Sequence, residues 1–104
     1  MANNQDKTAK KIQLWEGYEV ELNEQLFDDF DFMSDLNAAI NANDMSRIVT
    51  LYFALVGGED VYYDTRAYIE KNEGYFSMAS LREIMAKIEA FFPKTGNRAQ
   101  RRLN

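Results

Sequence analysis

Carboxylates, tyrosines and lysines are the side chains with which this chain could do chemistry, because its 104 residues include neither cysteine nor histidine. Without cysteine the chain can form no disulfide and no thiolate metal site. Without histidine it lacks the usual general base near neutral pH and the commonest metal ligand. We therefore expect no catalytic residues, no cofactor and no metal, and we expect that the protein is not an enzyme.

An acidic stretch is the first candidate for a metal site, and it contains Asp28, Asp29, Asp31 and Asp35. The stretch lacks the glycine and the terminal glutamate at the spacing that a calcium-binding helix-loop-helix requires. A helix dipole favours acids in the first turn, and we interpret these aspartates in that way.

Two adjacent glycines are the second candidate, because Gly57 and Gly58 precede a predicted helix as the glycines of a phosphate-binding loop do. No Lys-Ser or Lys-Thr pair follows them, and the carboxylates of Glu59 and Asp60 would repel an anion. The glycines are better explained as the end of one helix before the start of the next.

The candidate partner-binding residues are aromatic and basic: Tyr62, Tyr63, Tyr68, Tyr75, Phe76, Arg98, Arg101 and Arg102. The aromatic side chains either pack around a helix and the loop after it or form an interface between chains, where tyrosine is enriched. The arginines form either a solubilising end or a contact for RNA or an acidic protein surface.

Charge is unevenly placed along the chain, whose formal net charge is −5. Residues 94–104 contain four cations and no acid, whereas the middle of the chain is strongly acidic. We therefore expect no nucleic acid to bind the body of the protein. The glutamates at positions 16, 19, 21 and 24 form either a solvated strand face or a group that prevents indiscriminate pairing of an edge strand.

No apolar run approaches the length of a membrane span, and the N-terminal residues are polar, unlike those of a signal peptide. We expect no membrane partner and a cytosolic location. Residues 1–11 lack apolar spacing and residues 94–104 contain one large apolar side chain, so both segments should be mobile.

The elements that position these residues follow from hydrophobic periodicity. Residues 12–22 alternate apolar with polar side chains, which predicts a β-hairpin. We expect a three-residue loop, residues 15–17, because it sets Leu14 opposite Tyr18, whereas a two-residue loop would set Leu14 opposite Glu19. Two strands alone are marginal in water, so the hairpin should lie on helices or join a sheet of another subunit.

Four helices are predicted after the hairpin, over residues 28–40, 44–57, 60–72 and 80–92. The second is apolar on nearly every side, so we expect it to be buried at the centre. Asp44 should cap its start. The last helix should start at a capping box of Ser80 and Glu83, or at Ser77, and Pro93 should end it. This predicts a mainly α, α+β domain over residues 12–93.

Four segments follow one another in the chain: IQLWEGYEVEL, DDFDFMSDLNAAINANDMSRIVTLYFALVGG, SLREIMAKIEAFF and GNRAQRR. Together they resemble the tail assembly chaperones of long-tailed bacteriophages that infect Gram-positive bacteria. The resemblance spans residues 12–102, and it rests on the order, size and character of the segments more than on an invariant motif.

This resemblance implies a non-enzymatic protein of virion morphogenesis in the cytoplasm of the infected host. Such chaperones associate with themselves as homo-oligomers and hold the largely helical tape measure protein soluble until tail tube subunits polymerise around it. Many also exist as a longer product of ribosomal frameshifting, which would add the tail tube protein as a partner. The family has no catalytic residues to carry across, and no position here maps onto a defined binding motif.

Two other functions are compatible with the residues. The chain could be a small phage-encoded regulatory or inhibitor protein whose arrayed carboxylates bind a basic host protein. Alternatively, its basic C-terminal segment could bind RNA with an affinity that falls as salt is added.

Overall fold

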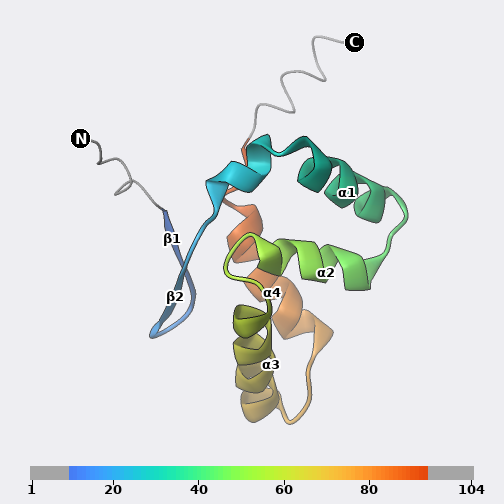
Figure 1. The fold of residues 1–104 in the computed structure, drawn as a ribbon. Helices are drawn as coiled ribbons and strands as arrows, with labels where there is room; N and C mark the ends of the chain where they lie inside the picture. The colour runs from blue at the N-terminus through green and yellow to red at the C-terminus, as the bar shows by residue number, and fades with distance from the viewer. Residues whose placement is uncertain (1–9, 94–104) are drawn as a thin grey trace, which may run out of the picture.

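Figure 1 shows a two-stranded hairpin followed by four helices in the computed structural model, which describes residues 10–93. The elements in chain order are β1 (Lys11–Trp15), β2 (Tyr18–Glu21), the 3-10 helix η2 (Glu24–Asp28), α1 (Phe30–Asn41), α2 (Met45–Ala54), α3 (Glu59–Glu73) and α4 (Met78–Glu89). The mainly α, α+β class expected from the sequence is confirmed. The segments expected to be mobile were residues 1–11 and 94–104. Residues 1–9 and 94–104 lie outside the described residues, whereas Lys11 is the first residue of β1.

The hairpin lies on helices of its own chain. One of its faces is buried, through Ile12, Leu14, Val20 and Leu22. This face packs where β1 contacts α4, and the Nζ atom of Lys87 in α4 donates a 2.9 Å hydrogen bond to the main-chain oxygen of Leu14. The helices therefore supply the apolar surface that two strands lack by themselves.

The turn of the hairpin differs from the expected one. Trp15 pairs with Tyr18, so the turn contains two residues, 16 and 17, and the expected pairing of Leu14 with Tyr18 is wrong. The register shifts between Gln13 and Trp15, which leaves Leu14 as an extra residue on β1. A bulge of this kind re-aims a side chain, and Leu14 is 0% exposed. The bulge thus allows the shorter turn without moving Leu14 out of the core.

Helix α2 is exposed over its first turn and buried mainly from Val49 onward. Val49 and the run 51–53 are buried, but the helix ends at Ala54, before the expected Gly57. The expectation that this helix is buried all round is therefore wrong: its first three residues, Met45, Ser46 and Arg47, are exposed, and so is Thr50, one turn further along.

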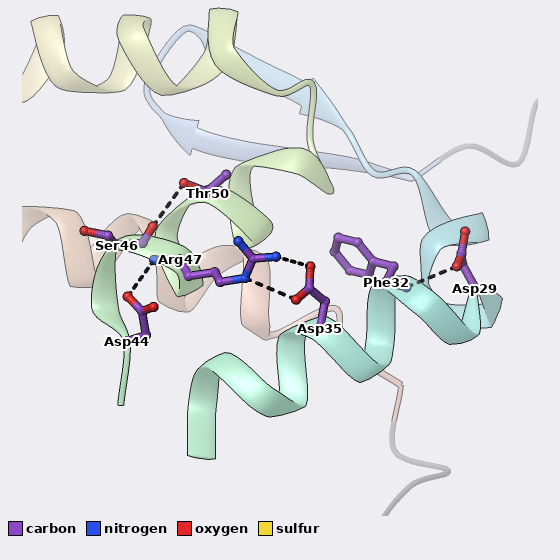
Figure 2. A network of polar contacts seen from close by, with 7 residues as sticks. All are labelled: Asp29, Phe32, Asp35, Asp44, Ser46, Arg47 and Thr50. Atoms are coloured by element: carbon purple, nitrogen blue, oxygen red, sulfur yellow. Dashed lines mark hydrogen bonds and ion pairs between the residues drawn. The ribbon is translucent and has the colours of Figure 1, made fainter. Parts of the chain in front are cut away.

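Two aspartates cap helices and a third joins them, as Figure 2 shows. The Oδ1 atoms of Asp29 and Asp44 accept from the main-chain N–H groups of Phe32, at 3.1 Å, and Arg47, at 3.3 Å. The guanidinium of Arg47 in α2 donates to both carboxylate oxygens of Asp35 in α1. The first-turn interpretation of the acidic stretch is confirmed for Asp31, which lies in the first turn of α1, and for Asp29, which caps it. Asp28 instead lies in η2, a helix that was not predicted from the sequence.

The boundaries of α3 and α4 follow local signals. Gly74, with a φ of 88°, ends α3 in the left-handed region as expected. Ser77 caps α4, since its Oγ atom accepts from the N–H of Ser80 at 3.1 Å. The capping box at Ser80 is therefore wrong, and its hydroxyl instead donates to Glu73 at 2.8 Å. The last helix ends at Glu89, before Pro93.

Candidate partner-binding groove

A groove of about 510 Å³ lies between α2, α3 and the segment that leads into α4. We call it the α2–α3 groove. Its lining residues are Met45, Ser46, Val49, Thr50, Phe53, Ala54, Gly58, Glu59, Tyr62, Tyr63, Phe76 and Leu81. Each side of the groove belongs to an element whose packing in the core fixes its position.

The floor of the α2–α3 groove is apolar. Val49, Phe53 and Leu81 reach it from the buried sides of α2 and α4 and are at most 8% exposed. The hydroxyl of Thr50 is occupied within its own helix, because Oγ1 donates to the main-chain oxygen of Ser46 at 3.0 Å. Contact with an apolar ligand therefore leaves few polar groups without partners.

Aromatic rings form the wall on the α3 side. The ring of Tyr62 makes edge contacts with the rings of Phe53, Tyr63 and Phe76, at centroid distances of 5.7, 5.1 and 6.0 Å. The guanidinium carbon of Arg66 lies 4.8 Å from the centroid of Phe76. Its Nη1 atom donates to the hydroxyl of Tyr62 at 3.3 Å. Edge-to-face and cation–π contacts of this kind hold aromatic side chains in place.

Two apolar side chains at the rim are open to solvent. Tyr63 is 58% exposed and Met45 is 36% exposed. Tyr75 and Met78, which are 64% and 44% exposed, do not line the groove. Tyr75 and Met78 are therefore exposed residues of the same two types outside the groove, and they serve as matched controls for Tyr63 and Met45.

The structure divides the candidate residues named from the sequence. Tyr62, Tyr63 and Phe76 come together at the α2–α3 groove. Tyr68 does not, because its ring stacks on Trp15 of the hairpin at a centroid distance of 4.2 Å. Tyr75 is exposed outside the groove. The remaining candidates, Arg98, Arg101 and Arg102, lie outside the described residues.

The α2 side of the groove was not predicted from the sequence. The prediction that residues 44–57 are buried all round placed Met45 in the interior. Ser46 and Thr50 are the signal that could have corrected it, because polar residues four apart lie on one face of a helix.

Tyr18 of the hairpin contacts α3 through its hydroxyl. The hydroxyl of Tyr18 donates to Asp64 Oδ2 at 2.7 Å. Burial and the Asp64 carboxylate raise the pKa of Tyr18 to about 12.

Among residues 10–93, no group of three or more acidic side chains is placed to hold a metal ion. The helices of this part of the chain are also too short or too polar to span a membrane.

Comparisons of the chain with protein-family models, curated proteins and solved structures found no match. We therefore interpret the groove from its own geometry and chemistry. Its apolar floor and its ordered aromatic wall are suited to apolar side chains of a partner.

Proposed function

We propose that this protein is a tail assembly chaperone of a long-tailed bacteriophage. It binds apolar helical segments of the tape measure protein in the cytoplasm of the infected host and keeps that protein soluble until the tail tube polymerises. It associates with itself, and it works without forming or breaking covalent bonds. The structural observation that carries the proposal is the α2–α3 groove; the resemblance of the chain's segments to this family names the client.

A helix of the client fits the α2–α3 groove better than a polar ligand does. Amphipathic helices bind by laying apolar side chains, one turn apart, into an apolar groove. The groove volume of about 510 Å³ lies within the range of roughly 300–1,000 Å³ of small ligand sites, enough for a few side chains. The flexible thioether of Met45 at the rim adapts to different apolar side chains.

The acidic character of the chain supports the chaperone role. Glu59 is the only charged residue that lines the groove among the described residues, whereas the whole chain has a net charge of −5. The groove therefore attracts apolar surface, and the surrounding charge repels other acidic complexes and keeps them apart in solution.

The proposed contacts for self-association are two exposed apolar side chains at opposite ends of α1. Phe30 is 81% exposed at the first position of α1, and Ile40 is 47% exposed near its end. Neither lines the α2–α3 groove. Contact between copies through α1 would cover these side chains and leave the groove open to the client.

Co-expression with a tape measure fragment that aggregates when made alone tests this function. The wild-type protein should move the fragment into the soluble fraction. Met45→Glu should abolish this effect, because it places a carboxylate at the apolar rim, and Met78→Glu should preserve it. A wild-type protein that leaves the fragment insoluble would contradict the proposal.

A further inference from the structure

The outer edge of β2 has unpaired main-chain groups. The main-chain N–H of Leu22 donates to the main-chain oxygen of Lys10 at 2.9 Å. The N–H and C=O groups of even-numbered residues of β2 therefore point toward β1, and those of odd-numbered residues point away from it. Asn23 follows this alternation, since its N–H donates outward to the oxygen of Leu55 at 2.8 Å. The outward groups of Glu19 and Glu21 have no main-chain partner within residues 10–93.

A broad hollow of about 1160 Å³ runs beside this edge. One side is formed by residues 18–25, and the other by Ala54, Val56, Gly57, Gly58 and Val61, around the turn between α2 and α3. An added strand would lie roughly 4.8 Å from β2 and therefore enter this hollow. The position of the hollow and the unpaired groups both fit an extended segment that adds to the sheet.

The charged side chains that line the hollow are all acidic. Glu19, Glu21 and Glu24 line it, and Glu24 is joined to Lys10 by a 3.1 Å ion pair. Pairing of this edge with the same edge of a second copy would bring like charges together across the strands, which is unfavourable. The occupant that the charge selects is therefore a basic segment.

The chain itself contains such a segment. Residues 94–104 carry four cations and no acid. They follow Phe92, whose ring lies 5.3 Å from the ring of Phe27 in η2, the element that comes directly after β2. An extended segment of this length spans about 36 Å, which is sufficient to reach β2 within one chain.

We propose that residues 94–104 dock as an extended segment on the outer edge of β2 in their own chain. Their main chain pairs with that of Glu19 and Glu21, and Arg98, Arg101 and Arg102 neutralise the acidic side chains beside the hollow. The docked segment covers an edge that could otherwise pair with other chains. This inference does not depend on the α2–α3 groove or on the identity of its client.

Amide hydrogen exchange measured by NMR on the full chain tests the docking. Deletion of residues 94–104 should speed exchange at Glu19 and Glu21 by about tenfold, the factor that a docked fraction of roughly nine-tenths gives. The amide of Val20 is an internal control, because it faces β1 in the hairpin and should keep its exchange rate. Equal rates at Glu19 and Glu21 in both proteins would overturn the proposal.

A charge variant separates docking from any effect of shortening the chain. The triple variant Arg98→Gln, Arg101→Gln, Arg102→Gln should speed exchange as the deletion does, and Arg82→Gln, an exposed site on α4, should not. Protection that is unaffected by the triple variant overturns the proposal. Protection that grows with protein concentration assigns the segment to a second copy and overturns docking within one chain.

Discussion

The Nζ atom of Lys87 donates a 2.9 Å hydrogen bond to the main-chain oxygen of Leu14, a residue 73 positions earlier in the chain. Leu14 is the bulged residue of β1, and bulged residues lose their partner on the neighbouring strand. The lysine of α4 therefore supplies the hydrogen bond that the hairpin cannot. This contact joins the first and last elements of the described fold.

Loss of this hydrogen bond should destabilise the protein. Lys87→Met keeps most of the apolar stem, so we expect the free energy of unfolding in urea to fall by about 1–2 kcal/mol, the cost of an unsatisfied and partly buried carbonyl. Arg82→Met, on the exposed side of the same helix, is the control and should leave the free energy of unfolding unchanged. Equal stability of the two variants would show that the contact contributes nothing.

A buried hydroxyl on α3 should limit stability. Thr65 is 0% exposed, and its Oγ1 atom has no hydrogen-bond partner within residues 10–93. Thr65→Val keeps the shape and removes the polar atom, so the free energy of unfolding should rise by about 1 kcal/mol. Thr50→Val, at an exposed site, should change it little. A less stable Thr65→Val protein would indicate that the hydroxyl has a partner.

The contact between Tyr18 and Asp64 should make stability depend on alkaline pH. The folded state raises the pKa of Tyr18 from 10.0 to about 12, so it favours the protonated phenol. The stabilisation is therefore complete below pH 10 and is lost as the pH rises toward 12. Tyr18→Phe should cost about 1 kcal/mol at pH 7, a low value because the pair is partly exposed.

The difference between wild type and Tyr18→Phe isolates this effect from the other groups that titrate above pH 10. We expect the two unfolding free energies, measured in urea from pH 8 to 12, to converge as the pH rises. A constant difference over this range would contradict the assignment of the raised pKa to the folded state.

Self-association should depend on the exposed aromatic residue at the start of α1. Phe30→Asp removes an 81% exposed ring and places a carboxylate in the first helical turn, where the dipole favours it. Sedimentation equilibrium should show oligomers of the wild type and a shift toward monomer for this variant. A strictly monomeric wild-type protein would contradict the proposed self-association.

Local signals made the helices predictable from the sequence. The side chain of Asp44 caps α2 by accepting from the main-chain N–H three positions later, and Gly74 ends α3 through its own backbone conformation. Both signals involve only neighbouring residues, so they can be recognised without knowledge of the tertiary structure. The bulge at Leu14 could not be predicted in this way. It depends on α4, whose lysine lies far away in the sequence.

The candidate site was predictable on one side only. Tyr62 and Tyr63 were identified as partner-binding candidates because they belong to a cluster of aromatic residues in the sequence, and both line the α2–α3 groove. Tyr68 was grouped with them because it is near in sequence, but its partner Trp15 belongs to the hairpin. Met45 was expected to pack in the core, but an apolar residue at a helix start can face either the core or solvent, and only the packing of α2 decides which.

The affinity of the protein for a soluble tape measure fragment tests the central claim most directly, when two tyrosine variants are compared by isothermal titration calorimetry. Tyr63 lines the α2–α3 groove, whereas Tyr75 is exposed outside it. We expect Tyr63→Glu to raise the Kd by at least about tenfold, since burial of a carboxylate against the client costs more than roughly 1.4 kcal/mol. Tyr75→Glu should leave the Kd unchanged. Equal Kd values for wild type and both variants would contradict a client site in this groove.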